Sequence, residues 1–203
     1  MAVMKTVQLK VGPMANFVYL LVDEESKDSL VVDSGWETEP IVAAAKKERA
    51  KVRYVVATHE HFDHTTTLQE LAKELGAKVV AHTSSPIEHD VSVADGEEIR
   101  LGSSAVRVLH TPGHTAYSIC LYDGAEVFTG DTLFVGTIGR FEKRNATEMY
   151  HSLYEVIMQL PDSTVMYPGH DYGEVPSRTL GKERGANVYL SAKSVSGFVS
   201  TFG

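Results

Sequence analysis

The chain has 203 residues, of which 43% are hydrophobic and 23% charged, an ordinary composition for a single globular domain over residues 1–203. The net charge of −8 argues against nucleic-acid binding, and no apolar run approaches the roughly 18 residues that a membrane span needs. The N-terminus lacks a signal peptide's apolar stretch, and the single cysteine, Cys120, cannot form an internal disulfide. We therefore expect a cytoplasmic protein that binds neither nucleic acid nor membrane.

The first half of the chain alternates short β-branched runs with amphipathic segments. Its predicted strands are Val3–Val11, Asn16–Val22, Ser29–Asp33, Val52–Ala57 and Ala77–Ala81. A helix is predicted over Glu39–Lys47, with Thr38 as its cap and Pro40 in its first turn. A second helix is predicted over Thr66–Leu75 and ends at Gly76.

The second half repeats this alternation. Its predicted strands are Ala105–Leu109, Ser118–Tyr122, Glu126–Thr129 and Thr164–Tyr167. Asp123-Gly124 indicates a hairpin between the second and third of these strands. Thr147–Leu160 is the longest predicted helix, and the tail after Gly173 is expected to be partly helical. Strands and helices mixed in two similar halves predict an α/β (α+β) fold with two packed sheets and helices outside them.

Four candidate metal ligands lie within six residues, directly after the predicted strand Val52–Ala57. They are His59, His61, Asp63 and His64. Imidazole and carboxylate are the donors that zinc prefers. His59 and His61, two apart in extended backbone, can point to the same side, whereas Asp63 and His64 lie near the start of the next helix. The pattern is His-x-His-x-Asp-His, not the His-Glu-x-x-His of helical zinc proteases, because Asp63 stands four residues after His59.

Three further candidates each follow the end of a predicted strand. They are His114 in Thr-Pro-Gly-His-Thr, Asp131 in Thr-Gly-Asp-Thr, and His170 in Tyr-Pro-Gly-His-Asp. Functional side chains gather on loops that a rigid sheet holds, and the glycine before each candidate permits close backbone approach or a positive φ. Seven candidate ligands without a cysteine indicate an open catalytic site, because structural zinc sites usually close four ligands around one ion.

The ordered segments THEHFDH, TPGHT, TGDTLF and YPGHDYG resemble the metallo-β-lactamase superfamily, and within it the glyoxalase II-like (hydroxyacylglutathione hydrolase-like) branch. The resemblance runs from about Asn16 to Tyr172 and implies a four-layer αββα sandwich of two mixed sheets. It also implies two divalent metal ions, with zinc favoured and iron or manganese compatible. The first metal would be held by His59, His61 and His114. The second would be held by Asp63, His64 and His170, with Asp131 bridging both and Asp33 supporting the site.

The departures from that branch bear on the substrate. Class B β-lactamases carry cysteine or serine where this chain has Asp131, which disfavours antibiotic hydrolysis. Only 33 residues follow His170, so we expect the helical segment with which glyoxalase II grips glutathione to be missing or reduced. Arg140 matches a basic glutathione-contacting position of the family, but Glu142 replaces the tyrosine expected soon after it. Arg140 and Tyr172 are the candidate substrate-binding residues.

The favoured reaction is hydrolysis of a small thioester by a hydroxide that bridges the metals, with Asp63 both as ligand and as orienter of that nucleophile. The alternative is a persulfide dioxygenase, whose single iron the resemblance would place on His59, His114 and Asp131. That family carries Gly-Arg-Thr-Asp-Phe where this chain has Gly-Arg-Phe-Glu-Lys at 139–143, which favours the hydrolase.

The remaining histidines and the cysteine are given ordinary roles. His110 is expected to pack or to hydrogen-bond beside the site. Surface or helix positions without a metal are expected for His82, His89 and His151. Cys120 is expected to be a small buried hydrophobe in an apolar strand.

Overall fold

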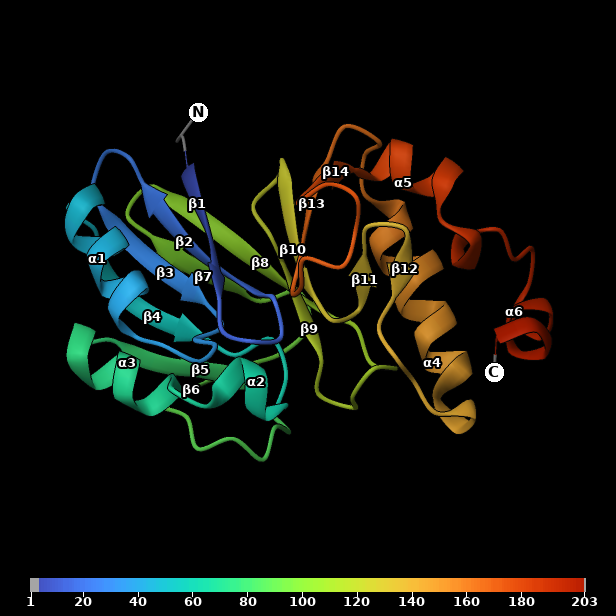
Figure 1. Cartoon of the computed structure of the whole chain (residues 1–203), viewed down its shortest axis with the longest axis horizontal. Coiled ribbons are helices and arrows are strands. Elements are labelled where there is room, and N and C mark those ends of the chain that lie inside the picture. The colour runs from blue at the N-terminus through green and yellow to red at the C-terminus, as the bar shows by residue number, and fades with distance from the viewer. Residues whose placement is uncertain (1–3, 203) are drawn as a thin grey trace.

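The computed structural model describes residues 4–202, which form two large sheets with helices on their outer sides (Figure 1). The strands of the first sheet, in spatial order, are β1 (Met4–Val11), β2 (Asn16–Asp23), β3 (Asp28–Val32), β4 (Lys51–Val56), β5 (Lys78–His82) and β6 (Val91–Val93). Those of the second are β14 (Arg178–Thr179), β13 (Val165–Pro168), β10 (Glu126–Gly130), β9 (Ile119–Tyr122), β8 (Ser104–His110) and β7 (Glu98–Leu101). A small ribbon pairs β11 (Leu133–Phe134) with β12 (Thr137–Ile138).

The first sheet changes from antiparallel to parallel pairing at β3. Strands β1, β2 and β3 form an antiparallel meander, whereas β3, β4, β5 and β6 run parallel. The crossover from β3 to β4 is α1 (Glu39–Glu48), and that from β4 to β5 contains α2 (Phe62–Thr65) and α3 (Leu68–Leu75). Parallel strands end at the same edge of a sheet, so the segments that follow β3 and β4 meet there.

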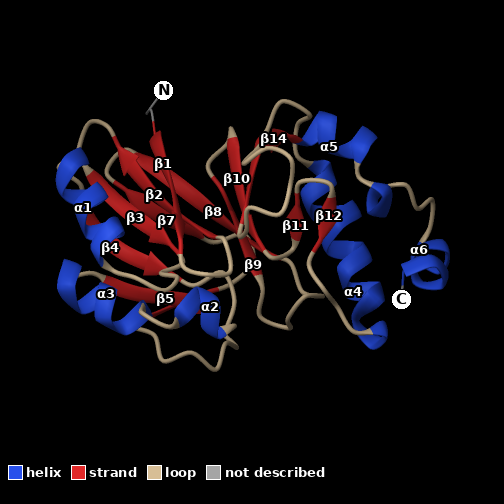
Figure 2. Ribbon diagram, in the orientation of Figure 1, coloured by secondary structure: helices blue, strands red, loops and turns tan. Residues whose placement is uncertain are grey.

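The second sheet is antiparallel from β7 to β10 and gains a parallel strand, β13, through a long helical crossover. That crossover contains the β11–β12 ribbon and then α4 (Ala146–His151). The tail contributes α5 (Leu180–Ala186) and α6 (Val195–Phe202), as the sequence predicts for the segment after Gly173. Figure 2 shows α4, α5 and α6 on one side of the molecule and α1 and α3 on the opposite side. The ends of β10 and β13 therefore lie side by side, which places Asp131 near His170.

Strand β2 explains the layering, because all eight of its residues are buried. Phe17, Tyr19 and Leu21 pack between the sheets, while Val18 and Leu20 pack into the separate core beneath α1 and α3. A third core lies under α4, α5 and α6. Alternate side chains of one strand thus enter two different cores, as a sheet covered on both faces requires. The expected αββα sandwich is confirmed.

The helix ends agree with the sequence at one position and not at another. Gly76 ends α3 in the left-handed conformation at φ 65°, as predicted. Thr38 occupies the cap position of α1, but its side chain makes no capping hydrogen bond; only its carbonyl accepts, from Val42 N. The capping role expected for the Thr38 hydroxyl is therefore wrong, because the backbone there is already helical at φ −84° and ψ −33°.

Two helix predictions need correction in their details. The predicted helix Thr66–Leu75 is found as α3 but begins two residues later, at Leu68, because Thr66 and Thr67 form a turn; the short helix α2, which precedes that turn, is not among the predicted helices. The predicted helix Thr147–Leu160 is not one regular α-helix. After α4 it continues as a π-helical turn over Ser152–Val156 and a 3₁₀ turn over Ile157–Gln159. β-Branched and aromatic residues populate this stretch and weaken the preference for regular α-helix.

Several short strands are absent from the sequence prediction, namely β6, β7, β11, β12 and β14. Each has two to four residues, too few for a period-two pattern to be distinguished. The predicted first residue of the first strand, Val3, lies outside the described residues. No helix within residues 4–202 is long and apolar enough to cross a membrane.

Candidate metal centre

The His-x-His-x-Asp-His segment leaves the carboxyl end of β4 and enters α2. His61 is extended at φ −63° and ψ 142°, and α2 begins at the next residue, so Asp63 and His64 lie in the first turn of a short helix, as expected. His59, Asp63 and His64 are buried. Burial of three polar side chains side by side is costly unless each finds a partner. The neighbourhood of this segment therefore has to supply such partners.

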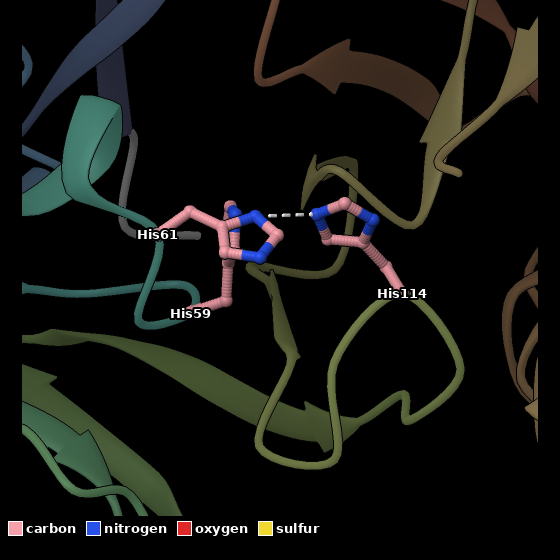
Figure 3. A group of neighbouring side chains, drawn as sticks. All are labelled: His59, His61 and His114. Atoms are coloured by element: carbon pink, nitrogen blue, oxygen red, sulfur yellow. Dashed lines mark hydrogen bonds between the residues drawn. The ribbon is translucent and has the colours of Figure 1, made fainter. Parts of the chain in front are cut away.

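The loops after β8, β10 and β13 bring His114, Asp131 and His170 to the same place. Three groups of potential donors arise, and within each group the donor atoms lie within 4.8 Å of one another. The groups are His59/His61/His114, His59/His64/Asp131 and Asp63/His64/His170. Figure 3 shows the rings of the first group turned toward one another. All seven residues singled out in the sequence thus come together, with the middle group lying between the other two.

In His64 and His170 the Nδ1 atom is hydrogen-bonded to an oxygen, and the two Nε2 atoms face each other. His64 Nδ1 donates to Asp33 Oδ2 at 2.8 Å, and His170 Nδ1 donates to the carbonyl of Met14 at 2.9 Å. Once the second proton is lost, an imidazole keeps one N–H, and the Nε2 atom of each of these rings then offers a lone pair to a cation. These two Nε2 atoms lie 3.1 Å apart, with Asp63 Oδ2 within 3.4 Å of both. A bound cation satisfies such a cluster of acceptors.

The same logic applies to the rings of His114 and His59. His114 Nδ1 donates to the carbonyl of Arg140 at 2.7 Å, which leaves its Nε2 bare and 2.9 Å from His61 Nδ1. Thr58 Oγ1 donates to Asp33 Oδ2, and it therefore accepts from His59 Nδ1 at 3.0 Å. His59 Nε2 and Asp131 Oδ1 are buried and have no hydrogen-bond partner among residues 4–202. These unpartnered atoms fit a bound metal, whose ligating histidines usually donate their other N–H to an oxygen.

The electrostatics of the centre favour positive charge. Burial lowers the pKa of His59 and of His114, which keeps both rings neutral and able to donate a lone pair. Burial alone would also lower the pKa of His64, but the carboxylates of Asp33 and Asp131 outweigh it and hold that pKa well above its ordinary value. Burial raises the pKa of Asp131, yet His64 and His170 outweigh it and hold that pKa well below its usual range.

Asp33 acts behind the ligands, as expected from the sequence. It directly follows β3 and has a positive φ of 62°. Its Oδ1 accepts from the Thr58 N–H at 2.8 Å, and its Oδ2 accepts from both the Thr58 hydroxyl and His64. One carboxylate thus fixes His64 directly and His59 through Thr58. Thr58 is a supporting residue that the sequence analysis misses, because a threonine between a strand and a histidine carries no distinguishing pattern.

Two glycines are required by close packing at the centre. A Cβ on Gly169 would lie 2.5 Å from Asp131 Oδ1, and one on Gly130 would lie 2.7 Å from Thr58 Oγ1. Gly130 also has a positive φ of 47°. A side chain at either position would displace a candidate ligand or its support.

The candidate substrate-binding residues lie on two sides of the centre. Arg140 lines a pocket of ≈ 410 Å³ together with His61, His114, Phe141 and Glu142. Glu142 pairs with Arg144 at 2.7 Å, whereas the Arg140 guanidinium forms no ion pair within residues 4–202. Tyr172 is 53% exposed and stacks on the ring of His170, with ring centroids 4.5 Å apart.

Two histidines outside the centre form a pair. His110 stacks on His82 with ring centroids 4.2 Å apart, and its Nε2 lies 3.0 Å from the carbonyl of Ala116. His110 thus packs close to the His114 loop, as predicted. The surface position expected for His82 is wrong, because this side chain is only 8% exposed at the end of β5. Cys120 is fully buried, as expected.

Comparison with known proteins supports the resemblance read from the sequence. The family model of the metallo-beta-lactamase superfamily matches residues 11–89 and 83–170. A probable hydroxyacylglutathione hydrolase of Schizosaccharomyces pombe is 36% identical over 170 residues, which cover 80% of this chain and 66% of that protein. The human mitochondrial persulfide dioxygenase ETHE1 is 36% identical over 181 residues, covering 86% of this chain and 71% of that protein. The chain thus spans about two thirds of the length of these relatives.

Among solved structures, ETHE1 from Myxococcus xanthus superposes with a TM-score of 0.90 at 33% sequence identity. The superposition covers 97% of this chain and 88% of that one. The similarity therefore extends through nearly the whole fold described above.

Proposed function

The chain belongs to the metallo-β-lactamase superfamily, and on that premise we propose that it is a metal-dependent hydrolase that cleaves a small thioester. The observation that carries the proposal is the double set of inward-facing donor atoms. His59, His61 and His114 make up one set, and Asp63, His64 and His170 make up the other. A site for one ion needs only one such set.

Each set is assigned to one divalent ion, with Asp131 between them. Zinc is the preferred ion for this donor chemistry, and iron or manganese is compatible with it. When bound, such a pair supplies Lewis acidity and lowers the pKa of a shared water toward neutrality. The protein supplies imidazole rings held in place by hydrogen bonds, two carboxylates and a pocket that opens beside His61 and His114. Asp63 is assigned a further role, in which its carboxylate orients the nucleophilic water.

The substrate is assigned to the pocket lined by Arg140. The guanidinium is available for an anionic group of the substrate, because the nearby Glu142 is already paired with Arg144. Tyr172 lies on the opposite side of the centre, above His170, where its exposed ring can border the acyl group. A thioester suits this arrangement because its thiolate leaves with little need of protonation.

The second candidate is the persulfide dioxygenase reaction. It is favoured by the likeness to ETHE1 in both sequence and structure. The dioxygenase reaction would use a single iron held by His59, His114 and Asp131. The group of Asp63, His64 and His170 would then bind no metal. Hydroxyacylglutathione, which the name of the hydrolase relatives gives as a substrate, is the first thioester to test, and a persulfide is the substrate to test for the second candidate.

The deciding experiment counts metal ions in protein purified without added metal and then measures two activities. We expect about two ions per chain, together with hydrolysis of a hydroxyacylglutathione thioester or of a simpler thioester. About one iron per chain, with oxygen uptake on glutathione persulfide and no thioester cleavage, would instead establish the dioxygenase.

A further inference from the structure

We infer that Asn16 and Trp36 are positioning residues that set the second metal group by fixing the carboxylate of Asp63. The inference rests on the proposed dinuclear function. Asn16 opens β2 and is only 1% exposed, although it lies next to a run of apolar residues. A buried amide needs partners at both of its ends. Those partners identify its role.

Both ends of the Asn16 amide form hydrogen bonds. Its Nδ2 donates to Asp63 Oδ2 at 2.9 Å and to the Asp63 carbonyl at 3.2 Å. Its Oδ1 accepts from Trp36 Nε1 at 2.8 Å. An indole N–H can only donate, so Trp36 determines which end of the amide is oxygen and leaves the NH₂ group facing Asp63. Trp36 in turn contacts Phe62 edge-on, with ring centroids 5.5 Å apart.

The oxygen that Asn16 holds is the one that faces the second group. Asp63 Oδ2 lies 3.4 Å from His64 Nε2 and 3.3 Å from His170 Nε2. A donor bonded to both the carboxylate and the backbone carbonyl of one residue restricts rotation of that carboxylate. The position of Oδ2 toward the two rings therefore depends on Asn16.

The backbone of the same turn holds His170. Asn16 and His170 form an antiparallel bridge, Phe17 N donates to the carbonyl of Gly169 at 2.8 Å, and His170 Nδ1 donates to the carbonyl of Met14. Residues 14–17 thus support two of the three members of the second group. The first group has different supports, namely Thr58 behind His59 and the Arg140 carbonyl behind His114. Loss of the Asn16 amide is therefore expected to affect the two groups unequally.

The test is a titration of the metal-free chain with zinc, in which calorimetry measures the heat of each binding step. The wild type is expected to bind two ions in two steps. Asn16→Leu keeps the approximate shape of the side chain and removes its amide. The zinc affinity of one binding step should fall about 10- to 100-fold, the usual effect of losing a residue that hydrogen-bonds a metal ligand. The affinity of the other step should be nearly unchanged. Trp36→Phe keeps an aromatic ring but removes the donor, and it should weaken the same step by a smaller factor.

Asn187→Leu is the matched control. Asn187 is also a buried amide, which bonds Glu183, the Thr137 carbonyl and the Tyr189 N–H away from the centre. This variant should lower the melting temperature and leave both zinc steps intact. If it weakens the same step, or if Asn16→Leu changes both steps equally or neither, the inference is overturned. A wild type that binds one ion only would instead overturn the dinuclear function on which the inference rests.

Discussion

Four of the five inward-facing histidines, His59, His64, His114 and His170, each have an oxygen atom hydrogen-bonded to the outer nitrogen of the ring. Asp33, Thr58 and the carbonyls of Met14 and Arg140 fix one nitrogen of a ring and leave the other bare. This arrangement costs stability in the absence of a cation, because bare acceptors are crowded together. The residues that matter for metal binding therefore include these supports as well as the seven candidate ligands.

Asp131 is the residue whose loss should do most damage. Its carboxylate contacts His64 at 3.3 Å and both His114 and His170 at 3.5 Å, so it reaches both donor sets. Asp131→Ala is expected to lose metal from both sets and to lower thioester turnover by more than about 100-fold, beyond the cost of losing an outer partner. Metal content and turnover measured on the same sample check this. Full turnover by the variant would contradict the role of Asp131.

Thr58→Val tests the support behind His59 with little change in shape. The valine removes the hydroxyl that joins His59 to Asp33, so the His59 ring loses its fixed orientation. We expect metal affinity to fall about tenfold, at the low end for an outer-shell partner. Competition with a chromophoric chelator measures the affinity. Equal affinity in variant and wild type would show that His59 is held in place without the hydroxyl.

Cys120 should be chemically inert in the folded chain. It lies on β9, fully buried, and burial raises its pKa to about 11, so almost no thiolate is present near pH 8. A thiol reagent is expected to label the native protein at least about 100-fold more slowly than the unfolded protein, because only the thiolate reacts. Mass spectrometry of timed samples gives both rates. Rapid labelling of the native state would mean that β9 opens readily.

At the scale of elements, the sequence predicts those strands and helices whose apolar residues form a long, regular pattern. β2 and β4 are clear because apolar residues fill them, and α3 is clear because Gly76 ends it. The ligand loops are equally clear, since each carries a histidine or aspartate directly after a strand. The short strands β6 and β14 are not, because their pairing depends on neighbours distant in the chain. Asn16 escapes notice for the same reason: its partners Trp36 and Asp63 are known only from the fold.

The turns that join β2 to β3 and β7 to β8 are tied together by Asp23. This buried carboxylate accepts from the Ser26 N–H and hydroxyl and from the hydroxyls of Ser103 and Ser104. The bond from Ser104, followed by those from Ser26, holds the pKa of Asp23 well below its usual range. A lowered pKa contributes stability that is complete above the unfolded value near 4 and declines as the pH falls below it.

Asp23→Asn should therefore destabilise the protein at pH 7 and have a smaller effect at acid pH. The loss at pH 7 is expected to be about 1.5–3 kcal/mol, the range for hydrogen bonds to a charged group. Urea unfolding of variant and wild type at pH 7 and near pH 3 measures the difference. A difference that does not shrink at the lower pH would argue that shape, rather than charge, explains the role of Asp23.

At the scale of the whole molecule, the centre joins the two sheets. Asp33 and His59 come from the first sheet, whereas His114, Asp131 and His170 come from loops of the second. A metal bound there binds only the folded chain and so stabilises it. The single domain over 1–203, the cytoplasmic location and the small-molecule substrate stay predictions at this scale.

Removal of metal should therefore lower the melting temperature. An ion present at 100 times its dissociation constant contributes about 2.7 kcal/mol, which for a chain of this size corresponds to roughly 5–10 °C. Thermal scans with and without a chelator test this in the wild type. In Asp131→Ala the chelator should have little effect. A chelator effect equally large in that variant would place the stabilising ion elsewhere.

The contact between the Met14 carbonyl and His170 also has a consequence for the order of folding. These residues are 156 positions apart, so their contact closes a loop that includes most of the chain. Contacts between such distant positions form slowly, because closing the loop costs conformational entropy before the contact contributes any stabilising energy. The group of Asp63, His64 and His170 is thus assembled only after the N-terminal turn has met the strand β13. If the chain binds two ions as proposed, we expect the second ion to be acquired only after this contact has formed.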